Sequence, residues 1–262
     1  MDNLWGNTSP DQEAMSKQNV LLPDAVNWLT VWSGARSLTI DGGAAMARRL
    51  RDEGHTVFAL AWEETVVRRL AAEESITPVW ARPEAIPTDP FQFDVVVTHQ
   101  KFHELDHEHA LGELARVLRP GGCLSASYVI RDDSVPWVRR LAALLRHYDP
   151  MAMKGAYGHQ SLDVLEGSKY FPEVEKRAFR VWQPVSLADL QDLVARQPLA
   201  RNLTEQQLDR LHSEVAELFS SSVRPGEMLR LPFQLLCLRA WVSHEEMTAP
   251  VRLTEDGVRI PI

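Results

Sequence analysis

The sequence has little cysteine, no long apolar run and no excess of basic residues. Its two cysteines, Cys123 and Cys237, lie in apolar strand-like runs, so we interpret them as buried free thiols in a reducing cytoplasm. No Cys-x-x-Cys pair offers a metal or redox centre. No run approaches the roughly 20 apolar residues of a membrane span, and the polar, acidic N-terminus is unlike a signal peptide. A net charge of −8 argues against a nucleic-acid partner, which requires a basic face.

The remaining composition is that of an ordinary globular protein. With 262 residues, 45% hydrophobic and 24% charged, the chain predicts one large domain, or one domain with an insertion. We expect a flexible N-terminus over residues 1–20, a main domain over 21–242 with a helical insertion at about 186–222, and a surface tail over 243–262. There is no internal repeat and no low-complexity segment.

The stretch 37–64 organises the rest of the chain. It reads as a short β-prone run, a turn at Asp41, Gly42 and Gly43, a run of helix formers closed by Gly54, and a second β-prone run. Such a unit opens a doubly wound α/β sheet, in which a nucleotide-like cofactor sits on the first turn.

Strand and helix patterns continue to alternate up to residue 148. A nearly continuous apolar run over 93–98 predicts a strand buried on both faces. Apolar spacing predicts a helix over 106–118, which Arg119-Pro120-Gly121-Gly122 ends before a further strand. Regular alternation implies parallel strands joined by right-handed crossovers.

After residue 149 the pattern changes. Residues 151–167 read as loop, and 174–182 and 229–242 read as strands, the last interrupted at Pro232. Between these strands lie two helices with capping boxes, the first starting at Ser186 and the second at Thr204.

These residues resemble a known family, the class I S-adenosylmethionine (SAM) dependent methyltransferases, of the type related to ubiquinone and menaquinone biosynthesis. The resemblance is densest over 22–148, and it rests on the runs 23–29, 84–87, 93–97, 102–103, 116–122 and 131–137. It implies a Rossmann-like sheet of seven strands, mostly parallel with one antiparallel strand, and SAM as cofactor. The two helices after Ser186 would then be an insertion near the C-terminal end of the sequence, beside the entrance to the substrate pocket.

The resemblance also implies where SAM contacts should lie, and the residues there are unusual. The three glycines of the family's turn correspond here to Ile40, Gly42 and Ala44, so only the middle glycine is present. The acid that should accept from the ribose hydroxyls falls on Ala61, which accepts nothing, although Glu63 follows closely.

At the adenine position the family's acid and its N–H donor fall on Arg82 and Pro83. Arginine cannot accept a hydrogen bond, and proline has no N–H. The cofactor-binding candidates by position are Asp41, Gly42, Gly43, Ala61, Glu63, Glu84, Ala85 and His99. We expect SAM binding to be weak or absent.

The run from His103 to His107 matches the zinc-protease pattern His-Glu-x-x-His. That chemistry needs both histidines on one helical face, whereas Asp106 reads as a helix N-cap, which puts His103 in the preceding loop. We therefore expect no metal. His103 remains a candidate general base at the pocket mouth, with a merely polar mouth residue as the alternative.

Two functions stay open from the sequence. One is a non-catalytic, methyltransferase-like protein (a pseudoenzyme) that acts through binding, and we favour it. The other is an active SAM-dependent methyltransferase with an atypical pocket that acts on a small or lipid-like molecule. The sequence identifies neither the small-molecule or protein partner nor the oligomeric state.

Overall fold

The computed structural model describes residues 21–40, 44–150, 152–153, 159–196, 198–224 and 226–247, and the backbone of 252–254 and 257–259. The predicted flexible segment 1–20 and the turn Asp41, Gly42 and Gly43 lie outside the described residues. Contacts group the chain into two compact units. The first takes Tyr128–Tyr157 and Ala178–Leu236, and the second takes Leu21–Ser127, Gly158–Arg177 and Cys237–Ile262.

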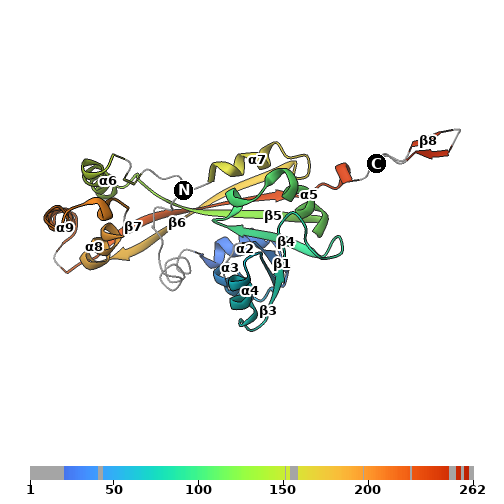
Figure 1. Cartoon of the computed structure of the whole chain (residues 1–262), viewed down its shortest axis with the longest axis horizontal. Coiled ribbons are helices and arrows are strands. Elements are labelled where there is room, and N and C mark those ends of the chain that lie inside the picture. Colours follow the sequence, from blue (N-terminus) through green and yellow to red (C-terminus); the bar gives the residue numbers. More distant parts are fainter. Residues whose placement is uncertain are drawn as a thin grey trace. The chain divides into compact units, whose positions relative to one another are not determined.

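The N-terminal half alternates helix and strand as predicted (Figure 1). Its elements are α2 (Pro23–Thr30), β1 (Arg36–Thr39), α3 (Ala44–Asp52), β2 (Thr56–Ala61), α4 (Glu64–Ala71), β3 (Ile76–Trp80), β4 (Phe93–His99) and α5 (His107–Val117). Strands β2, β1, β4 and β5 (Leu118–Arg131) are adjacent and parallel, which confirms the predicted parallel arrangement. The full sheet has seven strands in the order β3-β2-β1-β4-β5-β7-β6.

Strand β4 is the apolar centre of this sheet. Every residue of Phe93–His99 except Asp94 is buried, because β4 lies between β1 and β5 and both of its faces are covered. The prediction of a strand buried on both faces is confirmed.

The Arg119-Pro120-Gly121-Gly122 run interrupts the regular strand pairing within β5. It lies inside β5 as an irregularity in the pairing with β4, so the strand begins at Leu118 and not after the glycines. Gly121 has a φ of +77°, and a Cβ on Gly122 would lie 2.9 Å from two carbonyl oxygens, so glycine is required at both positions. Arg119 pairs with Asp94 at 2.7 Å, and the second Asp94 oxygen accepts from the N–H of Arg36 at 2.6 Å.

Two long strands complete the sheet, β6 (Glu173–Val185) and β7 (Leu229–Trp241). The N–H of Asp132 donates to the carbonyl of Pro232, and the N–H of Val242 donates to the carbonyl of Gly122. These two bonds make β7 antiparallel to β5, so the sheet is mixed as the resemblance implied. Strand β7 runs unbroken through Pro232, because the proline carbonyl still pairs with its neighbour.

The first unit contains three longer helices: α6 (Pro136–Tyr148), α8 (Leu187–Ala195) and α9 (Glu205–Ser220). Both predicted capping boxes are confirmed, since Ser186 accepts from the N–H of Asp189 and Thr204 from that of Gln207. Helices α8 and α9 follow β6 and precede β7, as an insertion would (Figure 1).

Short elements fill stretches that we expected to be loop or tail. They are η1 (Phe102–Glu104), η2 (His159–Leu162), α7 (Asp163–Glu166), η3 (Pro198–Asn202), η4 (Glu245–Met247) and the antiparallel pair β8 (Arg252–Thr254) and β9 (Gly257–Arg259). Such short elements carry too little apolar periodicity to be read from sequence. Among the described residues, no helix has the length and apolar composition to cross a bilayer.

Candidate functional site

Ala61 and His99 end β2 and β4, and Ile40 follows β1, so these three residues lie at the carboxyl edge of the sheet, where doubly wound sheets keep their sites. Ile40 follows β1 and is fully buried, and its N–H donates to the carbonyl of Val97 on β4 at 2.9 Å. A fully buried β-branched side chain therefore stands where the family has the first glycine of its turn. The next three residues of that turn, Asp41, Gly42 and Gly43, lie outside the described part of the chain.

Ala61 is the last residue of β2, which is the position expected for the ribose acid. Its side chain is buried, and its carbonyl accepts from the N–H of Ala81 at 3.1 Å. Glu63 is exposed at the N-cap of α4 and makes no side-chain capping bond. A carboxylate thus lies two residues past the strand, on the solvent side of a helix N-terminus.

The loop at the predicted adenine position satisfies most of its backbone internally. The N–H of Ala85 donates to the carbonyl of Arg82 at 3.1 Å, and the N–H of Ile86 donates to Oε1 of Glu113 at 2.7 Å. Pro83 is buried and has no N–H to offer. Glu84 is half-buried, next to the exposed Ala85.

A pair of charged residues on α5 holds this loop in place, and no pattern in the sequence marks the pair. Arg116 donates to the carbonyls of Ile86 and Thr88 at 2.9 and 2.8 Å and to both oxygens of Glu113. Hydrogen bonding from Arg116 lowers the pKa of the Glu113 carboxyl, so this acid is ionised near neutral pH. We call Glu113 and Arg116 the loop clamp.

His99 ends β4 and is buried at the carboxyl edge of the sheet. Its Nδ1 lies 2.9 Å from Oγ of Ser127 on the neighbouring strand β5. This contact fixes the orientation of the ring. His99 is therefore part of the packed sheet edge rather than an exposed group in a loop.

His103 lies in η1, after the end of β4, and its side chain is 37% exposed. Its Nε2 is 3.9 Å from Oε1 of Glu104. The exposure is compatible with the predicted role as a general base, and that role stays a prediction.

The zinc-like pattern does not form a metal site in the described part of the chain. Asp106 is the N-cap of α5, as predicted, so His103 precedes the helix and His107 starts it. The ring of His107 stacks on Phe102, and its Nε2 bonds the Phe102 carbonyl at 2.8 Å. His109 instead contacts Asp106 at 2.9 Å, which raises the pKa of His109. Among the described residues, no group of three potential ligands converges.

We expect the purified protein to carry no stoichiometric zinc, and a chelator to leave its melting temperature unchanged. The reason is that Nε2 of His107 is already bonded to a backbone carbonyl. Elemental analysis and a thermal melt with and without EDTA measure both quantities. One zinc per chain, lost both in a His103→Ala and in a His107→Ala variant, would contradict this.

The fold and the position of these residues define the class of protein. A mixed sheet of seven strands with the order found here, with an antiparallel β7 and with candidate residues at the carboxyl edge of β1, β2 and β4, is that of a class I methyltransferase. Among the described residues, Ala61 offers no side-chain acceptor at the end of β2, and the N–H groups of Ala85 and Ile86 are bonded within the protein.

Comparison with known proteins agrees with the fold. Residues 41–126 match the family model described as "Methyltransferase domain". The chain contains a methyltransferase domain of the class I SAM-dependent family, which confirms the resemblance at that level. The narrower likeness to ubiquinone and menaquinone methyltransferases stays a prediction.

Relatives exist in bacteria and yeast. An uncharacterized methyltransferase of Mycobacterium tuberculosis is 27% identical over 226 residues, which is 84% of this chain and 89% of the relative. One from Schizosaccharomyces pombe is 29% identical over 154 residues, covering 58% of this chain and 59% of the relative. A solved candidate type II methyltransferase from Anaeromyxobacter dehalogenans is 18% identical, with a TM-score of 0.61 over 83% of this chain and 95% of that one. This last likeness shows the fold.

Proposed function

We propose that this protein is a non-catalytic member of the methyltransferase family that binds SAM weakly or not at all and acts through binding another molecule. Cys123 and Cys237 are both free and buried, and because unpaired cysteines are typical of reducing compartments, we place the protein in the cytoplasm.

The observation that carries this proposal is the end of β2. Ala61 stands there with a buried side chain and a carbonyl already bonded to Ala81. The two ribose hydroxyls of SAM are donors that need an acceptor when they leave water, and an unmet polar group costs about 1–3 kcal/mol.

The adenine loop gives independent support. Its N–H groups at Ala85 and Ile86 are bonded within the protein, and Arg82 cannot accept from the exocyclic amine. Since the two regions lie on separate loops, no single local rearrangement would restore both sets of contacts.

The competing function is an active methyltransferase with an atypical pocket. The exposed Glu63, two residues past Ala61, favours it, because a changed turn would bring its carboxylate toward a ribose. The exposed His103 would then be the general base for a small or lipid-like substrate.

We expect the melting temperature of the protein to stay unchanged with 1 mM SAM or S-adenosylhomocysteine. A ligand present at about 1,000 times its Kd stabilises the folded state by about 4.1 kcal/mol, so 1 mM ligand at a site with a Kd of about 1 μM would raise the melting temperature by several degrees or more. Thermal denaturation followed by circular dichroism measures this. A shift with both ligands would refute the proposed function, and its loss in a Glu63→Ala variant would support the pocket that the competing function requires.

A further inference from the structure

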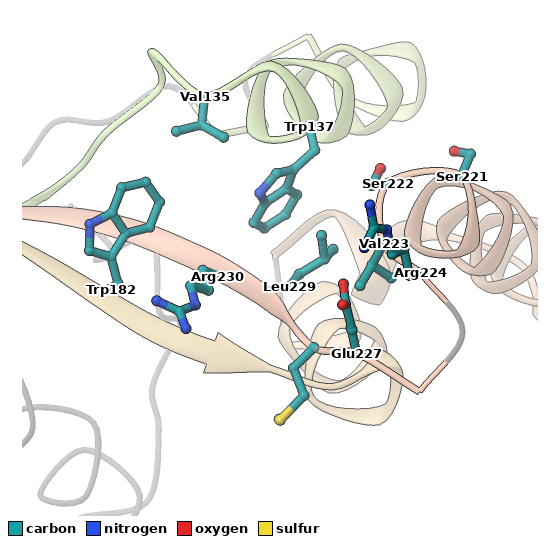
Figure 2. A pocket seen from close by; sticks show the side chains of 11 residues that line it. Val135, Trp137, Trp182, Ser221, Ser222, Val223, Arg224, Glu227, Leu229 and Arg230 are labelled. Atoms are coloured by element: carbon teal, nitrogen blue, oxygen red, sulfur yellow. The ribbon is translucent and has the colours of Figure 1, made fainter.

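The first unit contains a cavity of about 570 Å³, built from residues that play no part in the candidate cofactor site. Five of its lining residues carry the argument: Trp137, Trp182, Arg224, Glu227 and Arg230. Its volume lies in the range of small-molecule sites in proteins. In Figure 2, Trp137 projects from α6 toward the cavity, Trp182 reaches it from β6, and the arginines come from the region around the start of β7.

Two indoles form the aromatic wall. Trp137 lies in the first turn of α6, which Pro136 starts, and the residue is only 7% exposed. Trp182 is 43% exposed, which is unusual for so large an apolar side chain and leaves much of its ring open to a ligand.

A contact with Arg180 restrains the open indole of Trp182. The guanidinium of Arg180 lies 5.7 Å from the Trp182 ring centroid and is paired with Asp132 at 2.6 Å. Asp132 is buried and also accepts from the N–H of Ser134, so hydrogen bonds hold the pKa of its carboxyl at about 2. A fixed ring is a better stacking partner than a mobile one, because less side-chain entropy is lost on binding.

The cavity also carries positive charge that no described acidic side chain pairs with. Arg224 and Arg230 are exposed and form no ion pair with any residue in the described part of the chain, although the protein has a net charge of −8. Glu227 is the acid on the lining. Two guanidinium groups and one carboxylate leave one net positive charge, which matches a monoanion better than a polyanion such as a diphosphate.

We propose that this cavity binds a planar aromatic monocarboxylate, with its ring against the open indole of Trp182 and its carboxylate on the guanidinium of Arg224 or of Arg230. Arginine forms bidentate bonds with a carboxylate, and flat rings stack on indole, so the lining supplies one partner for each part of such a ligand. The inference rests on the proposed function for the idea that the chain acts through binding, and it names the place and the ligand class.

Isothermal titration calorimetry of the full chain with indole-3-acetate tests the proposed site. The neutral indole-3-acetamide serves as the matched control ligand, because it lacks the carboxylate. We expect indole-3-acetate to bind at one site per chain and the amide to bind at least tenfold more weakly. An Arg224→Gln, Arg230→Gln double variant should lose about tenfold to a hundredfold in affinity for the acid only, and Trp182→Ala about tenfold for both ligands. Arg201→Ala, which removes an exposed arginine outside the lining, should change neither.

Each of the following results would overturn the inference: equal affinity for the acid and the amide, unchanged affinity for the acid in the double variant, tighter binding of octanoate than of indole-3-acetate, or no binding at all. A parallel titration with SAM keeps the two proposals apart. SAM binding alongside the expected indole-3-acetate result refutes the proposed function and leaves this site standing. No binding of either ligand refutes the site alone.

Discussion

We expect the wild-type protein to give no calorimetric heat with SAM at ordinary concentrations. We expect a fourfold variant, which combines Ile40→Gly, Ala61→Asp, Arg82→Asp and Pro83→Ala, to recover measurable binding. The variant restores a glycine after β1, an acceptor at the end of β2, and an acceptor with a following N–H in the adenine loop.

The size of the loss follows from the contacts that are missing. Charge-assisted hydrogen bonds contribute roughly 1.5–3 kcal/mol each, and each 1.4 kcal/mol is a factor of ten in affinity. Losing the ribose acid and the two adenine contacts removes about three such bonds, so we expect affinity to fall by on the order of a thousandfold or more. A micromolar site of the family would become millimolar.

The matched control is the triple variant that keeps Ala61. Since it lacks the ribose acceptor, we expect it to bind SAM at least tenfold more weakly than the fourfold variant. Circular dichroism must show that both are folded, because Ala61→Asp puts a carboxylate at a buried position. Tight SAM binding by the wild type would refute the proposed function, and no binding by the folded fourfold variant would show that other residues cause the loss.

The second large effect concerns the loop clamp. We expect Glu113→Ala to lower the free energy of unfolding by about 2–3 kcal/mol, because it removes a charge pair with Arg116 and leaves the N–H of Ile86 without its acceptor. For a chain of this length, each kcal/mol of lost stability lowers the melting temperature by roughly 2–4 °C. Urea denaturation measures the free energy, and Glu217→Ala on the exposed face of α9 should cost less than about 0.5 kcal/mol.

The effect of Glu113 should also depend on pH. Arg116 lowers the pKa of the folded carboxyl below its ordinary value of 4.5, so the folded state binds this proton more weakly than the unfolded chain. Its contribution is therefore complete above about pH 4.5 and is lost as pH falls through the lowered pKa. A stability difference between wild type and Glu113→Gln that stays constant down to about pH 3 would contradict this assignment.

Local stretches of sequence were sufficient to predict much of the fold. The apolar run of β4, the capping boxes at Ser186 and Thr204 and the N-cap at Asp106 each depend on residues close together in the chain. The regular alternation of helix and strand then led to adjacent parallel strands, which the structure confirms. The position of Ala61 at the end of β2 was predicted from the resemblance to the methyltransferase family.

The contacts between distant segments could not be predicted in this way. The loop clamp joins Ile86 to Glu113 across 27 positions, and no local pattern marks a glutamate that will accept from a remote N–H. The cavity takes Trp137, Trp182 and Arg230 from a helix and two strands that are separated in the chain. Propensity and periodicity act over a few residues, whereas these contacts exist only after the sheet has placed its strand ends together, and they therefore follow from the fold and not from any stretch of sequence.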